Sequence, residues 1–475
     1  MADSLRKIFS SPTIMTWLSY FVRFGSTIFI LPLILLKLPE AEIAVWFVFL
    51  LVIGLSQLAD SGFGPTIIRA TSYFYSGSKH IPKNIKEFKG NNEKFDTINF
   101  NGLKSLLGTI NIVYLVLGII AMILILIVGK LITTNSISMT DNEVMLNFAF
   151  YLIVIQSFFS LQITKWSSFI QGIDQVASIK RVESVFDLFK IFFSVLVLTL
   201  GYGIFGLIAI RLVFRILMLI YVRGFVKKWF KNYEQEDFIK YNFNKKIFLS
   251  IWPSTWRFGA MLYGGYLVNN GTGIVVSQIN NPTLIASFLL TQRLIFFIRQ
   301  VSQAPLYANL PRIFQMMAKK EYRILKQFSA RAITIGLGMQ LIALILLLSI
   351  GPEILDLLGA KTSLVPLPIV LIMSISIMLE LHHAYHANIY LGTNHVPFLI
   401  PAIASGAAIV GISFGIVDSY GLIGIVLVQF FVQLSLNNWY PVYLNLKLLD
   451  WKFSDYLKCL MNFQNIFNKN LIRKM

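Results

Sequence analysis

The chain has 475 residues, of which 56% are hydrophobic and only 13% are charged, and its formal net charge is +19. A mean hydropathy of +0.70 argues against a soluble globular protein, and apolar runs such as residues 112–129 are long enough to cross a hydrocarbon layer of ~30 Å. The alternating segments of about ten residues that build a membrane β-barrel are missing from the sequence, so we predict an all-α polytopic membrane protein.

About twelve membrane spans are predicted, and MADSLRKIFSSP leads into the first without the small-residue cleavage site of a signal peptide. The predicted spans are 13–36, 42–68, 105–128, 144–164, 182–200, 204–222, 250–277, 284–306, 328–350, 364–389, 397–417 and 422–446. Lys and Arg gather at the N-terminus and after even-numbered spans, which predicts that both termini are cytoplasmic. Topology and attraction to anionic lipid heads then explain most of the positive charge, so nucleic acid is not a predicted partner.

The second predicted span ends irregularly. Within QLADSGFGPTIIRA (57–70), Asp60 is followed by Gly62, Gly64 and Pro65. These residues predict a break or bend, which a membrane tolerates only where protein or water satisfies the freed backbone groups. We expect Asp60 to accept a hydrogen bond from a freed amide or to pair with an arginine in a cleft.

Three short sequence matches link the two halves of the chain. They are YGIFG (202–206) with YGLIG (420–424), QGIDQV (171–176) with LGTNHV (391–396), and RFG (23–25) with RFG (257–259). The matches fall at equivalent places in two sets of six spans, which predicts a parallel repeat about the membrane normal. We therefore predict two six-helix lobes around a central cleft. The N-terminal lobe is 1–230, and the C-terminal lobe is 231–475 with a short basic cytoplasmic tail.

Arginines inside the predicted spans are candidate anion contacts, because an intramembrane charge is costly and usually functional. Arg23 lies near the middle of the first span in a polar stripe, with a structural ion pair as the alternative. Arg257 has the equivalent place in the second lobe, although it is closer to the cytoplasm and two tryptophans lie beside it. Arg293 and Arg299 point about 120° apart on the eighth span, so we expect one of them to face the cleft.

Ionisable residues of other spans can also be interpreted as structural. Asp187 and Arg215 are predicted to form a structural ion pair across the hairpin of the fifth and sixth spans. Glu380 and His383 share a helix face and are candidates to bind and release a proton, with buried hydrogen bonding as the alternative. His382 and His386 have a metal-chelating spacing, but no further ligand completes a site, so no metal is predicted.

The stretch LADSGFGPTIIRA (58–70) resembles the end of the second span in polysaccharide exporters: aspartate, small residue, glycine, bulky residue, glycine and then arginine. These are the O-antigen (Wzx-type) flippases, in the same superfamily as multidrug MATE antiporters and the lipid II flippase. The span count, the cytoplasmic termini, the paired YGxxG motifs and the parallel repeat are similar too. The chain departs from the family in a longer polar insertion at 76–100 and in its histidine cluster.

The resemblance implies a cargo of O-antigen or capsule repeat units on polyprenyl pyrophosphate, moved by alternating access from the cytoplasmic to the periplasmic leaflet of the bacterial inner membrane. It implies no enzymatic step and no cofactor. The implied partners are the lipid-linked oligosaccharide, membrane lipids and other polysaccharide-assembly membrane proteins. Guanidinium suits this cargo because it stays charged at any depth and binds phosphate bidentately. The predicted substrate contacts are Arg23, Arg257, Arg293, Arg299, Asp60, Tyr263 and Asn270, and the predicted proton or ion-coupling residues are Glu380 and His383.

Other functions remain to be weighed against this one. A cation antiporter of the multidrug type shares the architecture but would place acids rather than arginines in the cleft. A membrane glycan polymerase or ligase would act on the same lipids. It would need a sizeable outward loop, whereas the longest predicted one is KLITTNSISMTDNE (130–143). A purely structural membrane protein would not need arginine at the midplane of several spans.

Overall fold

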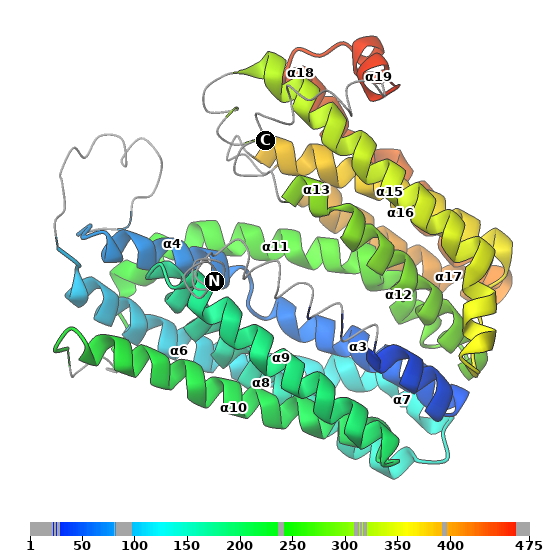
Figure 1. The fold of residues 1–475 in the computed structure, drawn as a ribbon, viewed down its shortest axis with the longest axis horizontal. Helices are drawn as coiled ribbons and strands as arrows, with labels where there is room; N and C mark the ends of the chain where they lie inside the picture. Colours follow the sequence, from blue (N-terminus) through cyan, green and yellow to red (C-terminus); the bar gives the residue numbers. More distant parts are fainter. Residues whose placement is uncertain are drawn as a thin grey trace, which may run out of the picture. The chain divides into compact units, whose positions relative to one another are not determined.

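The computed structural model describes residues 22, 25, 29–79, 81, 97–235, 242–307, 313, 316, 321–391 and 397–461, and every regular element in these ranges is helical (Figure 1). The helices, of which η1 and η2 are π-helical, are α3 (Glu40–Leu58), α4 (Phe63–Tyr75), α6 (Phe100–Leu124), η1 (Ile125–Gly129), α7 (Lys130–Ser138), α8 (Glu143–Gly172), α9 (Val176–Thr199), α10 (Gly203–Lys231), α11 (Lys245–Val276), α12 (Pro282–Ser302), α13 (Ala304–Tyr307), α15 (Tyr322–Leu357), α16 (Leu367–Leu391), α17 (Leu399–Val432), η2 (Gln433–Asn437), α18 (Tyr440–Leu448) and α19 (Phe453–Met461). The predicted substrate contact Arg23 lies outside the described residues.

Seven helical runs in the described ranges are long and apolar enough to cross a membrane. Two of them are composite, because α6 continues through η1 into α7 and α17 continues through η2 into α18. The predicted spans from 105–128 onward fall on helices, whose ends differ from the predicted ones by up to nine residues, and 397–417 and 422–446 lie in one helical run, Leu399–Leu448. The second predicted span, 42–68, is divided between α3 and α4. In its described part the chain is all-α and polytopic, as its composition predicts.

The most apolar run, α6 to α7, shows how lipid replaces a soluble protein's core. The most apolar stretch of this run has a mean hydropathy of 3.1, yet only 28% of that stretch is buried. Leu115, Ile119 and Ile123 project outward from it. Lipid accepts such side chains, so helix association depends instead on close packing at small residues. Gly118 provides one such place, because a Cβ there would lie 2.6 Å from the Phe158 ring.

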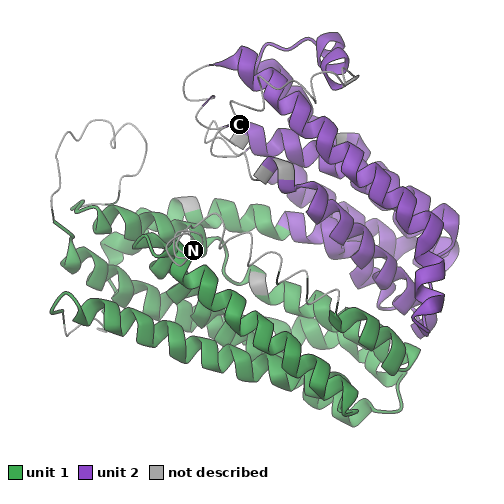
Figure 2. Ribbon diagram, in the orientation of Figure 1, with its two compact units in different colours: residues 1–263 green, residues 264–475 purple. Residues whose placement is uncertain are grey.

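The chain divides into two compact units, residues 1–263 and 264–475, with the division inside α11 (Figure 2). In the first unit α8 is central and packs against α10, α6 and α4. In the second unit α16 is central and packs against α18, α15, α12 and α17. Each unit has a buried cluster of its own, which includes Phe169 and Phe230 in the first and Phe328 and Tyr385 in the second.

The first glycine of the repeated YGxxG motif has the same φ in both units. Gly203, at the start of α10, has a φ of 54°, and Gly421, at a kink inside α17, has a φ of 55°. Both values lie in the left-handed region that favours glycine. The last glycines of the two motifs are equivalent as well, because a Cβ on Gly206 or Gly424 would lie 2.7 or 2.5 Å from the Cβ of the motif tyrosine. The sequence match therefore reflects one turn geometry used twice.

Candidate functional site

The irregular stretch at the end of the second predicted span is a true break in the helix. After α3, Ser61 has a φ of 48° and Gly62 a φ of 78°, both in the left-handed region. The Ser61 amide donates to the Leu58 carbonyl at 2.8 Å, and the Phe63 amide donates to the Asp60 carbonyl at 2.9 Å. Two tight turns thus end α3 and start α4, and a left-handed glycine is needed where they meet.

Asp60 holds this break through neutral hydrogen-bond donors. Its Oδ2 accepts from the Gly64 amide at 2.9 Å, and its Oδ1 accepts from the Tyr114 hydroxyl at 2.5 Å. In turn the Tyr114 carbonyl accepts from Gln162 Nε2 at 2.8 Å, and Gln162 Oε1 accepts from Lys165 Nζ at 2.8 Å. Of the two roles expected for Asp60, the structure therefore shows the bond to a freed amide, and no ion pair to Asp60 occurs within the described ranges.

Helix α11 packs against the break so closely that the two backbones are almost in contact. A Cβ on Gly62 would lie 2.9 Å from the Thr255 carbonyl oxygen, and a Cβ on Gly259 would lie 2.5 Å from the Ser61 carbonyl oxygen. Nearby, the Phe63 and Trp252 rings pack with centroids 6.2 Å apart. Gly259 belongs to the second RFG match, so this repeat residue and the DSGFG stretch are packed against each other.

Beside this contact, on nearly the same side of α11, lies an exposed aromatic face. Trp252, Trp256 and Tyr263 are 42%, 44% and 38% exposed, and they lie within about 40° of one another on the helix. Arg257 is exposed at the edge of this face, with its guanidinium 5.8 Å from the Trp256 ring centroid. In the part of the chain that the structure describes, Arg257 makes no ion pair.

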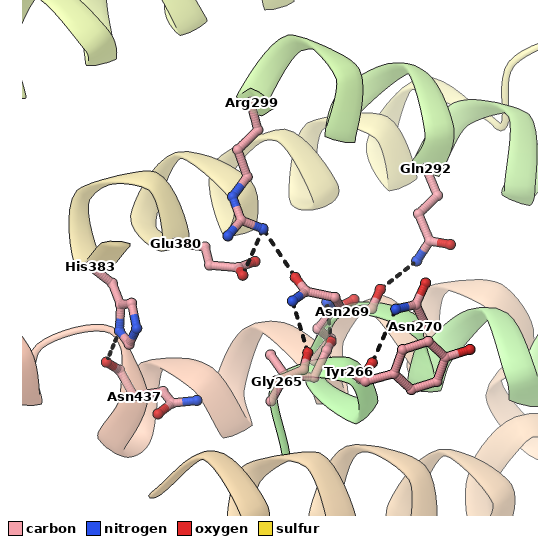
Figure 3. A network of polar contacts seen from close by, with 11 residues as sticks. Gly265, Tyr266, Asn269, Asn270, Gln292, Arg299, Glu380, His383 and Asn437 are labelled. Atoms are coloured by element: carbon pink, nitrogen blue, oxygen red, sulfur yellow. Dashed lines mark hydrogen bonds and ion pairs between the residues drawn. The ribbon is translucent and has the colours of Figure 1, made fainter. Parts of the chain in front are cut away.

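A second polar site lies in the other unit, where α11, α12 and α16 meet (Figure 3). Arg299 Nη1 lies 2.7 Å from Glu380 Oε1 and donates to Asn269 Oδ1 at 3.0 Å. The side chains of Arg299 and Glu380 are only 18% and 7% exposed. Arg299 Nε is buried and has no hydrogen-bond partner among the described residues. The structure thus brings together a predicted substrate contact and a predicted coupling residue.

Amide side chains fix the wall of this site. Asn269 Nδ2 donates to the Gly265 carbonyl at 2.8 Å, and Gln292 Nε2 reaches the Asn269 carbonyl at 3.4 Å (Figure 3). Gln292 also donates to Thr272 Oγ1 at 3.1 Å. Asn270, a predicted substrate contact, donates instead to the Tyr266 carbonyl at 3.2 Å. These bonds fix Asn269, and thereby one acceptor of Arg299, without help from Glu380.

His383 contacts the backbone rather than a side chain. Its Nδ1 hydrogen-bonds the carbonyl of Asn437, the last residue of the π-helical turn η2 (Figure 3). Because a carbonyl only accepts, Nδ1 carries the hydrogen and the neutral ring keeps a free lone pair on Nε2. Single π-helical turns are frequent at functional sites. His383 is thus positioned to accept a proton near Glu380.

Other predicted residues lie apart from this network. Arg293 is exposed on α12 and makes neither an ion pair nor a hydrogen bond with any residue that the structure describes. Asp187 pairs with Lys190, three residues along α9, and the Arg211 guanidinium lies 4.6 Å from the Trp46 ring centroid. The pairing of Asp187 with a cation was expected, and its predicted pairing with Arg215 stays a prediction.

Two other histidines of α16 tie it to α19. His382 and His386 both contact the Tyr456 hydroxyl of α19, the latter at 2.9 Å, and Asn445 of α18 contacts His386 Nδ1 at 2.9 Å. These are hydrogen bonds between helices, which corresponds to the structural interpretation of the histidine cluster and not to metal binding.

Sequence reasoning missed several residues that build these sites. Tyr114, Gln162 and Lys165 connect to Asp60, and Gln292 and Asn437 support the second site. Their one signal in the sequence was polarity inside or beside an apolar run. That signal identifies a buried hydrogen bond but gives no partner.

No protein-family model matches the chain, and no curated protein matches its sequence. Solved structures do match. An inward-facing multidrug resistance MATE family transporter of the MOP superfamily has a TM-score of 0.67 and 14% identity, over 93% of this chain and 96% of that one. The lipid II flippase MurJ in an inward closed conformation has a TM-score of 0.64 and 13% identity, over 94% and 90%.

A further match is a MOP superfamily transporter from Pyrococcus furiosus, described as having a binding pocket of reverse polarity that suggests a different function. Its TM-score is 0.56, with 14% identity over 94% of this chain and 96% of that one. At such identities the likeness establishes the fold. The predicted fold class, that of MATE transporters and the lipid II flippase, is therefore confirmed.

Proposed function

We propose that this membrane protein is a flippase that moves a polyprenyl-pyrophosphate-linked oligosaccharide from the cytoplasmic to the periplasmic leaflet by alternating access. The fold that it shares with a lipid II flippase supports a lipid-linked cargo. The excess of arginine over acid inside the predicted spans supports an anionic one. Its place is then the bacterial inner membrane, with both termini in the cytoplasm.

The observation that carries the proposal is the state of Arg257 and Arg293. Both are exposed on helices of a membrane protein, and neither makes an ion pair within the described residues. A guanidinium cannot be left against lipid tails without a large cost, so it needs water or an anion. A diphosphate supplies the acceptor oxygens that bind this fork-shaped group bidentately.

The aromatic face of α11 suits the sugar part of the cargo. Trp252, Trp256 and Tyr263 present exposed rings on one side of the helix that also carries Arg257. Aromatic rings with polar edges combine apolar contact with hydrogen bonding, as a saccharide requires. The membrane potential assists transport, because moving each negative charge outward gains about 2.3 kcal/mol per 100 mV.

A cation antiporter on this fold is the second candidate, and the first matched structure is a MATE transporter. Such a protein needs carboxylates that are available to a cation. The described acids inside the predicted spans already have donors. Asp60 has Tyr114, Asp187 has Lys190, Glu380 has Arg299, and near the span ends Glu42 has Asn142 and Glu183 has Lys180. This difference in available charge favours the anionic cargo.

The test is reconstitution in liposomes with lipid-linked oligosaccharide, in which exposure of the sugar in the outer leaflet is followed over time. We expect Arg257→Ala and Arg293→Ala to slow transport roughly tenfold or more, because a lost charged hydrogen bond costs at least about 1.5 kcal/mol. Lys228→Ala, which removes an exposed cation near the end of α10, is the matched control and should be unaffected. Normal transport by folded Arg257→Ala and Arg293→Ala proteins would contradict the proposal.

A further inference from the structure

We propose that Glu380 and the diphosphate of the cargo compete for Arg299, so that Glu380 takes up a proton whenever the anion binds. The inference rests on the proposed function, because it assumes an anionic cargo. It adds a coupling mechanism: proton and anion bind together, and they leave together. The atoms involved are Arg299 Nη1 and Nε, the Glu380 carboxylate and the cargo's phosphate oxygens.

The contact between Arg299 and Glu380 leaves much of the guanidinium unused. Both described contacts of Arg299, to Glu380 Oε1 and Asn269 Oδ1, are made by Nη1 (Figure 3). Nε is buried and finds no hydrogen-bond partner in the described part of the chain, although a side-on carboxylate would engage it. An unpaired donor of a buried charged group is costly, so an anion that reaches the Nε edge gains what the present pairing lacks.

The hydrogen bond to Asn269 keeps Arg299 in place while its anionic partner is exchanged. This neutral acceptor is fixed by its own bond to the Gly265 carbonyl and by Gln292. When the carboxylate leaves, the guanidinium therefore keeps one of its two acceptors and its approximate position. Since Arg299 is 18% exposed but Glu380 only 7%, the arginine is the member of the pair that a ligand reaches more easily.

The fate of Glu380 follows from its burial. As a pair, Arg299 and Glu380 have no net charge, and their mutual attraction offsets the desolvation of each. Once phosphate takes the guanidinium, an ionised Glu380 would be a buried, unpaired carboxylate beside an anion. Such a group neutralises by binding a proton. The proton adds to a carboxylate oxygen, and no other covalent bond forms or breaks.

The surroundings of Glu380 are consistent with a proton carrier. The charged or titratable groups that the described contacts place against it are Arg299 from α12 and His383 on its own helix. Asn269 of α11 and the Asn437 carbonyl of η2, which complete the network, are neutral. In its neutral form His383 donates through Nδ1 to the Asn437 carbonyl and keeps a lone pair on Nε2, so it can hold the proton in transit.

The experiment is calorimetric titration of the purified full-length protein with inorganic pyrophosphate, in two buffers of different ionisation enthalpy. The parent protein should take up about one proton more per pyrophosphate than Glu380→Gln, which still reports the probe's own protonation. Affinity of the parent should fall about tenfold per pH unit more steeply than that of the variant. Glu353→Gln, an exposed acid on α15, is the matched control and should behave as the parent.

A second measurement needs only the parent protein and so does not depend on the variant's folding. Its infrared difference spectrum on adding pyrophosphate should gain the band of a protonated carboxyl group. Pyrophosphate binding without that band and without the extra proton would overturn this inference and leave the proposed function standing. If pyrophosphate does not bind to the folded parent at all, the anionic cargo itself is contradicted.

Discussion

Asp60 in the first unit and Glu380 in the second are both carboxylates among membrane helices, and their surroundings differ. Asp60 accepts from a backbone amide and a tyrosine hydroxyl, both neutral, beside a glycine contact so close that no side chain fits. Glu380 faces a guanidinium that contacts it through one nitrogen and whose Nε has no partner among the residues that the structure describes. Each carboxylate oxygen of Asp60 already accepts a hydrogen bond, one of them from the backbone. The Arg299–Glu380 pair leaves the Nε donor unused among the described contacts, so this pair can exchange partners.

The largest effect should come from filling the glycine contact beside Asp60. Gly259→Ala places a Cβ 2.5 Å from the Ser61 carbonyl oxygen, and neither backbone can yield without moving α11 off the break. We expect a loss of about 3 kcal/mol of stability or no folded protein, as for severe overpacking. Thermal unfolding in detergent, followed by size-exclusion chromatography, measures it.

Gly338→Ala is the control for this change, because its new Cβ on α15 meets nothing within 4 Å. It should be neutral or gain up to about 1 kcal/mol through helix propensity. If both variants unfold at the same temperature as the parent protein, the break is not the rigid contact described above.

A pair of isosteric substitutions compares the two carboxylates directly. Glu380→Gln leaves Arg299 without a counter-charge and should cost about 3 kcal/mol, as when one partner of a buried ion pair is removed. Asp60→Asn keeps an acceptor for the Gly64 amide, and the Tyr114 hydroxyl turns to accept, so its cost should be about 1 kcal/mol. Chemical or thermal unfolding of the two variants gives the ranking.

Pyrophosphate sharpens the same comparison. It should raise the unfolding temperature of Glu380→Gln more than that of Asp60→Asn, because only the first variant frees a guanidinium for the anion. Equal shifts for both variants would show that the two carboxylates do not differ in the way proposed.

Tyr114→Phe removes one hydrogen bond from Asp60 and tests whether the role of Asp60 is purely structural. We expect a loss of about 1 to 2 kcal/mol of stability, because a partly buried acceptor loses one donor. Transport should be unchanged once the protein has folded. Slow transport by a fully folded variant would instead assign Asp60 a part in cargo handling. Liposome transport and thermal unfolding, measured on the same preparation, separate the two outcomes.

The sequence predicts the helices well, because a membrane span is recognised by the length of its apolar run. It also predicts the break, because Gly62 frees the backbone locally and Pro65 restricts it. Pairing between helices is different. Asp187 was matched by depth to Arg215, and its pairing with that residue stays a prediction beside the ion pair that it makes with Lys190 on the same helix. Helix rotation decides such pairing, and an all-apolar pattern around a lipid-exposed helix carries little information about rotation.

The same reasoning explains how far the second site could be predicted. Arg299 and Glu380 are conspicuous as charges in apolar runs, so each could be named as a candidate. Their contact joins α12 and α16, which are far apart in sequence, and depends on Asn269 from a third helix. Nothing local in the chain specifies that three helices meet there.

The smallest effect concerns a group of polar residues in the second unit that resembles the surroundings of Asp60 more than those of Glu380. Tyr456 of α19 contacts His382 and His386, and its burial raises the pKa of the hydroxyl, so it remains a neutral donor. Tyr456→Phe should therefore cost only about 1 kcal/mol and should leave proton uptake with pyrophosphate unchanged. Hydrogen exchange of residues 453–461 should rise severalfold as α19 detaches more often. Tyr443→Phe on α18, whose side chain is exposed, is the matched control and should leave that exchange as it is. If Tyr456→Phe instead abolished the extra proton uptake, the histidines beside Glu380 would belong to its proton pathway. A residue whose hydrogen-bond partners are all neutral could then no longer be taken as purely structural.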